Sequence, residues 1–216
     1  VSDERVLMAE LSSGRSTTKL HDRKEFNVPA NRYGDDVEAI LISEDALQSR
    51  IQELADMVSE RYRDAEDDLM LVCVLKGAVL FLTDFARKLS IPCEMEFMAV
   101  SSYGNSTTSS GVVRILKDLD KEIEGRDVLV VEDIIDSGLT LSWLLKNLKG
   151  RAPKSLEVIT LLRKPEVQTA KIDLLDVGFD IPNEFVIGYG LDYAERYRDL
   201  PYVGTLHPRV YSEQEA

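Results

Sequence analysis

An uninterrupted apolar run over residues 69–75 (LMLVCVL) is the feature that most constrains the fold of this chain. A strand with one face in water alternates polar and apolar side chains, whereas a strand covered on both faces is apolar throughout. Residues 128–131 (VLVV) show the same pattern, and two further buried strands are predicted over residues 156–162 and 185–188. Strands of this kind are typical of a parallel sheet that is covered on both faces.

Helical patterns separate these apolar runs. Apolar residues recur every three or four positions between residues 47 and 62, after Ser43, which is a good helix N-cap. Further helices are predicted over residues 78–89 and 141–148, and two shorter strands over residues 94–100 and 112–116. The alternation of strands and helices predicts an α/β fold with a doubly wound, mainly parallel central sheet and helices on both faces.

The length and the N-terminal composition suggest one domain with an appendage. A chain of 216 residues fits one domain of ordinary size. Residues 1–36 are polar, mixed in charge and without sustained periodicity, so we predict a flexible N-terminal arm there. The domain itself is then expected to span residues 37–216.

The charge and the rare residues exclude several classes of protein. There are 39 Asp and Glu residues against 26 Lys and Arg, a formal net charge of −13, which argues against general binding of nucleic acid or of an anionic membrane. Two cysteines, Cys73 and Cys93, cannot form a disulfide framework. No apolar run approaches the roughly 20 residues of a membrane helix, and the first residues lack signal-peptide features. A cytoplasmic protein is predicted.

The segment that carries the most chemistry is residues 128–140, VLVVEDIIDSGLT. A predicted buried strand ends in Glu132 and Asp133, and Asp136 precedes a turn of small and hydroxylated residues, Ser137–Thr140. Such a turn at a helix N-terminus exposes backbone N–H groups that can bind a phosphate. Paired carboxylates can accept hydrogen bonds from vicinal sugar hydroxyls or hold a divalent ion, so the segment predicts a ribose-phosphate site. The alternative is that these acids only cap a helix and solvate a loop.

This segment resembles the phosphoribosyl-pyrophosphate (PRPP) signature of the purine phosphoribosyltransferases, specifically the hypoxanthine-guanine enzymes of the bacterial kind. Three other segments carry the resemblance: Leu75-Lys76-Gly77, Ser102-Tyr103-Gly104, and residues 185–193 (FVIGYGLDY) followed by Arg198-Asp199. The resemblance implies the type I fold of this family, in which a small hood subdomain covers the active site. It also implies a homo-oligomer, either a dimer or a tetramer.

The resemblance assigns roles to individual residues. It implies that Asp136 is the catalytic acid/base for the purine N7 proton. The PRPP ribose and 5′-phosphate would be bound by Glu132, Asp133, Asp136, Ser137, Gly138, Leu139 and Thr140. Pyrophosphate would be bound by Lys76, Gly77 and Arg198, with a non-proline cis bond before Lys76. The purine would be bound by Lys164, Phe185, Val186 and Asp192, a mobile lid would begin at Ser102 and Tyr103, and magnesium (Mg2+) would be held by Glu132, Asp133 and Asp192.

Some of these residues also allow plainer interpretations. Lys164 would donate to the purine O6, but Arg163 is its direct neighbour and could take that role. Phe185 could simply pack in a strand core. Lys76 could end its strand as a solvated side chain. The polar stretch over residues 101–111 could be a linker instead of a lid.

The implied reaction transfers the 5-phosphoribosyl group from PRPP to N9 of hypoxanthine or guanine, giving IMP or GMP and pyrophosphate. Magnesium would neutralise the leaving pyrophosphate. Two alternatives stay open from the sequence. One is a phosphoribosyltransferase that accepts xanthine, which differs from guanine only at C2. The other is a nucleic-acid-binding regulator built on the same fold, which the charge of −13 disfavours.

Overall fold

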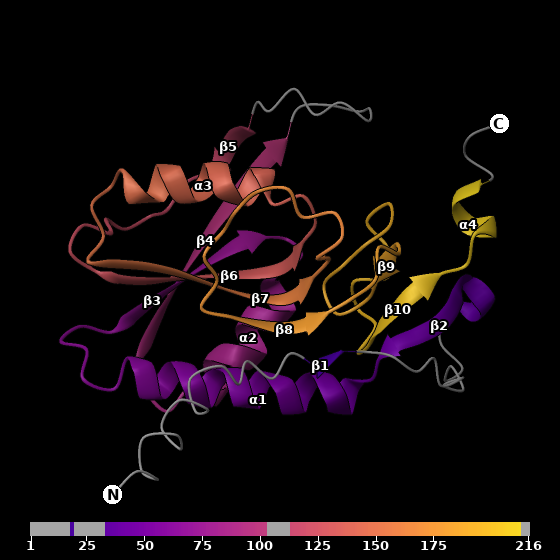
Figure 1. The fold of residues 1–216 in the computed structure, drawn as a ribbon, viewed down its shortest axis with the longest axis horizontal. Coiled ribbons are helices and arrows are strands. Elements are labelled where there is room, and N and C mark those ends of the chain that lie inside the picture. Colours follow the sequence, from indigo (N-terminus) through magenta and orange to yellow (C-terminus); the bar gives the residue numbers. More distant parts are fainter. Residues whose placement is uncertain (1–17, 20–32, 103–112, 213–216) are drawn as a thin grey trace, which may run out of the picture.

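A seven-stranded, mainly parallel sheet forms the centre of the molecule (Figure 1). The computed structural model describes residues 18–19, 33–102 and 113–212. The strand order is β1-β8-β7-β6-β3-β4-β5, and every neighbouring pair is parallel except β4 with β5. The strands are β1 (Thr18–Lys19), β3 (Leu69–Leu75), β4 (Cys93–Ser102), β5 (Val113–Lys117), β6 (Asp127–Ile135), β7 (Ser155–Arg163) and β8 (Asp176–Asp180).

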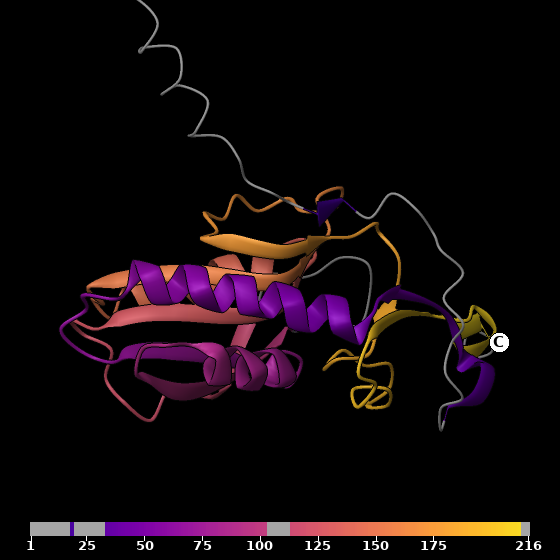
Figure 2. The ribbon, with the colours of Figure 1, turned by 90° about the horizontal axis from the view of Figure 1, so that it is seen from below.

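Helices cover both faces of this sheet, which explains the continuous apolar runs. Helices α1 (Glu44–Arg61) and α2 (Val79–Lys88) pack on one face, and α3 (Leu139–Lys149) packs on the other (Figures 1 and 2). Leu71 and Cys73 of β3 belong to the core under α1 and α2, whereas Met70 and Val72 belong to the core under α3. Successive side chains of a strand point to opposite faces, so each residue of β3 needs an apolar side chain.

A second, smaller sheet lies beyond one end of the main sheet, where the resemblance predicts a hood (Figure 2). It joins β2 (Val37–Ile42), β10 (Val203–Leu206) and β9 (Val186–Ile187) in antiparallel order. A separate apolar core that includes Val37, Ile187 and Tyr202 holds it together. The short helices η1 (Gly34–Asp36) and α4 (Arg209–Ser212) flank this sheet in the sequence.

Most predicted elements are confirmed, and two predictions are wrong in ways that affect the site. The strand over residues 69–75 matches β3 at both ends, and Ser43 caps α1, its side chain accepting from the N–H of Ala46 at 3.3 Å. Strand β6 does not end at Glu132 and Asp133 but continues to Ile135, so the two acids lie within the strand. The predicted buried strand at residues 185–188 is only β9, and it belongs to the small antiparallel sheet.

Two short elements lie within residues 1–36, the range of the predicted N-terminal arm. Thr18 and Lys19 form a short edge strand parallel to β8, with Thr18 paired to Phe179. Residues 34–36 form η1 and lead directly into β2. The division into an arm over residues 1–36 and a domain over residues 37–216 stays a prediction.

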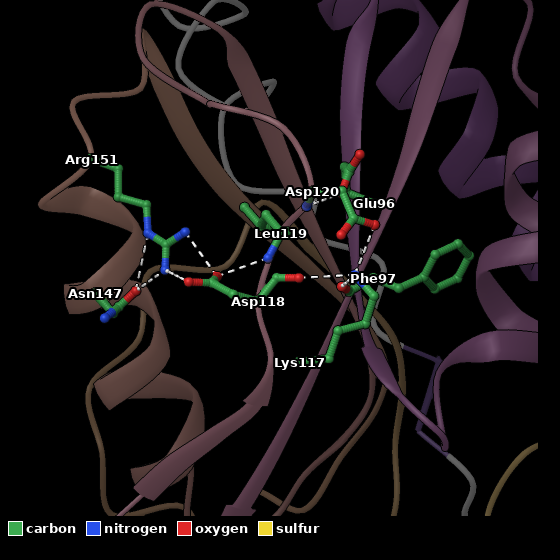
Figure 3. Close-up of polar contacts among 8 residues, drawn as sticks. All are labelled: Glu96, Phe97, Lys117, Asp118, Leu119, Asp120, Asn147 and Arg151. Carbon is green, nitrogen blue, oxygen red and sulfur yellow. Dashed lines mark hydrogen bonds and ion pairs between the residues drawn. The ribbon is translucent and has the colours of Figure 1, made fainter.

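The end of β5 and the loop after it are tied to two neighbouring elements (Figure 3). The Lys117 ammonium donates to the carbonyl of Phe97 in β4 at 3.1 Å, and the guanidinium of Arg151, just beyond α3, pairs with Asp118 at 2.8 Å. These contacts fix the base of the β4–β5 pair.

Ser102, the first residue of the predicted lid, is the last residue of β4, whereas Tyr103 and most of the predicted lid lie outside the described residues.

Candidate functional site

A cavity of about 380 Å³ lies where the loops after β3, β6 and β7 meet the segment that follows β9. The structure brings together there every residue that was predicted to bind pyrophosphate or purine, along with Asp133 and Asp136. The lining residues are Lys76, Gly77, Asp133, Ile134, Asp136, Lys164, Phe185, Val186, Leu191, Asp192 and Arg198. Parallel sheets commonly bind ligands beyond the carboxyl ends of their strands, and this cavity has that position.

A second cavity of about 140 Å³ adjoins the first at the N-terminus of α3. It is lined by every residue predicted for the ribose and 5′-phosphate except Asp133, which faces the first cavity. The lining residues are Glu132, Ile134, Ile135, Asp136, Ser137, Gly138, Leu139, Thr140 and Leu141. Gly138 precedes α3 with a φ of 74°, a backbone conformation that favours glycine. Ile134 and Asp136 line both cavities, so a ligand that fills both would pass beside Asp136.

Two glycines allow the walls of the larger cavity to touch. A Cβ atom on Gly77 would lie 1.5 Å from Oδ2 of Asp133, and a Cβ atom on Gly190 would lie 2.0 Å from the carbonyl oxygen of Gly77. Side chains at these positions would push apart β6, the loop after β3 and the segment after β9. The Leu75–Lys76 peptide bond is cis, as the resemblance predicts.

Two cations of the cavity, Lys76 and Arg198, are paired with carboxylates of the segment after β9. The Lys76 ammonium lies 2.7 Å from Oε2 of Glu195, and the Arg198 guanidinium lies 2.7 Å from Asp192 and 3.4 Å from Glu195. The Lys76 ammonium lowers the pKa of the Glu195 carboxyl. Sequence reasoning missed Glu195 because a lone Glu in a loop forms no pattern. Its place three residues after Asp192 and three before Arg198 was the only available signal.

The side chains of Lys164 and Arg163 have different surroundings and different partners. Lys164 is only 8% exposed, lines the cavity and places its ammonium 2.8 Å from Oδ1 of Asp136. Arg163 instead forms two hydrogen bonds with Asp180 of β8, at 2.6 and 2.8 Å. Of these two neighbours, Lys164 is therefore the one that faces the cavity.

Phe185 lies at the cavity with 49% of its surface exposed, so it is not a strand-core residue. Its ring packs edge-on against Tyr193, with 5.7 Å between the ring centroids. An aromatic ring that is partly open to solvent offers a face on which a flat ligand can stack.

Two partly buried acids, Glu132 and Asp133, are neighbours in β6 at the junction of the cavities. Burial raises the pKa of Asp133 to about 6, and burial together with the charge of Asp133 raises the pKa of Glu132 well above its ordinary value. Oε2 of Glu132 is buried without a hydrogen-bond partner. A buried polar atom of this kind is costly unless a ligand or an ion satisfies it.

We therefore expect Asp133→Asn to stabilise the ligand-free protein at neutral pH. A carboxyl whose folded pKa is raised costs stability when it is ionised. The cost is absent near pH 3, where the group is mostly protonated in both states, and is fully present above about pH 6. One pKa unit corresponds to about 1.4 kcal/mol, so we expect a gain of about 1–3 kcal/mol at pH 7.5 and almost none at pH 3.

Urea unfolding of both proteins at the two pH values measures this difference. The exposed Asp173→Asn variant is the matched control, and its free energy of unfolding should equal that of the wild type at both pH values. Equal or lower stability of Asp133→Asn at pH 7.5 would contradict the electrostatic account of the junction.

Comparisons with known proteins agree on one family. The phosphoribosyl transferase domain family matches residues 43–194. The hypoxanthine-guanine phosphoribosyltransferase of Mycobacterium avium is 61% identical over 189 residues, covering 86% of this chain and 93% of the relative. The Bacillus subtilis protein of the same name is 52% identical over 176 residues, covering 82% and 97%. A crystal structure of a Staphylococcus aureus hypoxanthine phosphoribosyltransferase superimposes with a TM-score of 0.78 at 43% identity, covering 82% and 95% of the two chains. In the described part of the chain, no helix is long and apolar enough to cross a membrane.

Proposed function

The chain belongs to the hypoxanthine-guanine phosphoribosyltransferase family, and from this premise we propose how its two cavities perform the family's reaction. The enzyme acts in purine salvage, transferring the 5-phosphoribosyl group of PRPP to N9 of hypoxanthine or guanine with release of pyrophosphate. One observation supports this assignment of the cavities above all. The smaller cavity carries the phosphate-binding turn, the larger one carries the cations and Phe185, and Asp136 borders both.

The smaller cavity would hold the 5′-phosphate of PRPP. The N–H groups of the first turn of α3 would bind the anion there, and Ser137 and Thr140 would add hydroxyl groups. The ribose would then lie between Glu132 and Asp133, whose negative charges favour the positive charge that develops on the ring as its bond to pyrophosphate breaks. Lys76, the backbone at Gly77 and Arg198 would bind the pyrophosphate.

The carboxylates of the site suit magnesium. Asp133 and Asp192 line the larger cavity, and Glu132 has a buried oxygen without a partner. Within residues 18–19, 33–102 and 113–212, no three His, Cys, Asp or Glu side chains form a metal site by themselves. The three predicted ligands are thus not gathered into one ready-made site, and Mg2+ would be held by one or two of them together with substrate phosphates. When bound with PRPP, the ion would neutralise charge on the pyrophosphate.

The purine would lie in the larger cavity between Phe185 and the loop after β7. The ring of Phe185 would stack on the base, and the main chain of Val186 would face its edge. The Lys164 ammonium would donate to the 6-oxo group, and Asp136 would hold or release the N7 proton. In the ligand-free protein the 2.8 Å pair between Lys164 and Asp136 keeps both polar groups satisfied until the base arrives.

Glu195 would compete with pyrophosphate for Lys76. We expect Glu195→Gln to lower the KM for PRPP by about two- to fivefold, because an exposed ion pair is worth about 0.2–1 kcal/mol. Steady-state kinetics at saturating hypoxanthine measures the change, and 0.5 M salt should abolish it. Glu166→Gln is the control on a carboxylate outside both cavities. A higher KM in Glu195→Gln would mean that Glu195 assists PRPP binding.

One assay tests the proposed function directly. The purified protein is incubated with PRPP and Mg2+ and with hypoxanthine, guanine, xanthine or adenine in turn, and nucleotide formation is followed. We expect IMP and GMP, and little product from adenine. Efficient use of xanthine would favour the xanthine-accepting alternative, and nucleotide formed from adenine alone would contradict the proposal. Homo-oligomerisation and a cytoplasmic location stay part of this proposal.

A further inference from the structure

We propose that Tyr189 is a positioning residue for pyrophosphate. Its hydroxyl group ties the segment after β9 to Asp84 of α2 and Gln48 of α1, and this tie sets the distance between the two halves of the pyrophosphate site. The inference rests on the proposed function, because it takes Lys76, Gly77 and Arg198 as the pyrophosphate ligands.

The proposed pyrophosphate site is assembled from two separate parts of the fold. Lys76 and Gly77 belong to the loop that leads into α2, whereas Arg198 belongs to the segment between β9 and β10. The two parts meet where Gly190 approaches the carbonyl oxygen of Gly77 so closely that a Cβ atom would lie 2.0 Å from it. Pyrophosphate can be bound by both halves only if this approach is maintained.

The tie is a buried hydrogen-bonded group beside that contact. Tyr189 is only 5% exposed, and its hydroxyl donates to Oδ2 of Asp84 at 2.6 Å. The Gln48 side-chain amide donates to the same oxygen at 2.7 Å and lies 3.5 Å from the Tyr189 hydroxyl. Asp84 lies on α2, the helix that begins directly after the Lys76 loop. The bond therefore joins the two halves of the site.

Hydrogen bonds of the backbone around Tyr189 link its position to that of Arg198. The N–H of Tyr189 donates to the carbonyl of Leu200 at 2.9 Å, and that of Gly190 donates to the carbonyl of Arg198 at 2.9 Å. The Arg198 guanidinium in turn donates to the carbonyl of Gly190 at 2.8 Å. A displacement of Tyr189 would therefore move Arg198 as well.

The backbone conformation of Tyr189 is unfavourable, which indicates that contacts of its side chain compensate for it. Its φ is 49°, between two glycines with φ of 93° and 99°. Bulky side chains are uncommon in this left-handed region, which is strained for residues other than glycine. A glycine would adopt this backbone conformation without strain. In Tyr189 the packing of the ring and the hydrogen bond of the hydroxyl group offset the strain.

The test uses Tyr189→Phe, which keeps the buried ring and removes only the hydroxyl. We expect the dissociation constant for magnesium pyrophosphate and the KM for PRPP to rise about tenfold, the size of a hydrogen bond to a charged group. The affinity for IMP should stay within about twofold, because IMP occupies only the purine site and the phosphate turn. A general loss of structure would weaken both ligands together.

Tyr62→Phe is the matched control. Tyr62 is 7% exposed, and its hydroxyl donates to a carboxylate, Glu157, at 2.7 Å, but it follows the opposite end of α1 from Gln48. This variant should lose similar stability in urea and bind pyrophosphate normally. Asp84→Ala should reproduce the pyrophosphate defect of Tyr189→Phe, and the double variant should be no worse than either single variant.

The outcomes separate this inference from the proposed function. If Arg198→Ala weakens pyrophosphate binding but Tyr189→Phe does not, the site assignment stands and the tie is wrong. If Arg198→Ala leaves pyrophosphate binding unchanged, the site assignment fails and the inference fails with it. Equal losses of IMP and pyrophosphate affinity in Tyr189→Phe, or a pyrophosphate defect in Tyr62→Phe, would also overturn the inference.

Discussion

Replacing Asp136 by asparagine is expected to slow phosphoribosyl transfer by about 10²–10⁴-fold, the range of a general acid–base group, with little change in PRPP affinity. The structure explains why the two effects should separate. Asp136 borders both cavities, and asparagine has the same size and can still accept a hydrogen bond from Lys164. It cannot take up or release a proton at the purine N7. The change therefore removes the proton transfer and keeps the shape of the site.

Single-turnover rates with guanine, together with the dissociation constant for PRPP, measure the two effects. Asp180→Asn is a suitable control, because Asp180 pairs with Arg163 just as Asp136 pairs with Lys164, but it does not line either cavity. It should leave the single-turnover rate unchanged. An Asp136→Asn enzyme with a normal rate would rule out the proton-transfer role.

Five strands of the main sheet could be predicted from the sequence because their signals are local, whereas its strands β1 and β8 were not predicted. The apolar run of β3 and the three- and four-residue spacing of α1 each follow from burial of that element alone. Strands β2 and β10 were missed because residues far apart in the sequence pair to form them, Ile42 with Val203 for example. No local pattern records such a pairing.

The ends of elements were harder to predict than their cores. The apolar run of β6 stops at Val131, but its pairing with β7 continues, so Glu132 and Asp133 are strand residues. Their adjacent places in one strand send their side chains to opposite faces. Glu132 accordingly lines the smaller cavity and Asp133 the larger one. The sequence indicated a pair of acids but not that the pair divides between two cavities.

The resemblance supplied the residues of the site, and the structure supplies their partners. The ion pairs of Glu195 with Lys76 and of Lys164 with Asp136 join segments that are distant in the sequence. Neither pair could be inferred from spacing. Tyr189 likewise lay inside a recognised motif, but its bond to Asp84 depends on how α2 meets the segment after β9.

Lys164→Gln is expected to lower the ratio of kcat/KM for hypoxanthine to kcat/KM for adenine by about 10- to 100-fold. The variant would therefore prefer 6-oxopurines less strongly. A 6-oxo group accepts from the Lys164 ammonium, whereas the 6-amino group of adenine would leave this buried donor facing another donor. An unpaired buried donor costs about 1–3 kcal/mol, more when it is charged. Glutamine can rotate its amide to offer a donor or an acceptor, so it should tolerate both bases and leave PRPP affinity unchanged.

The most direct measurement of this account is the ratio of kcat/KM for hypoxanthine to that for adenine, compared among the wild type, Lys164→Gln and Arg163→Gln. The structure points Lys164 into the cavity and ties Arg163 to Asp180. We therefore predict that the ratio falls in Lys164→Gln and holds in Arg163→Gln. A ratio that holds in Lys164→Gln, or that falls equally in Arg163→Gln, would contradict the assignment of this cavity as the one that selects the base.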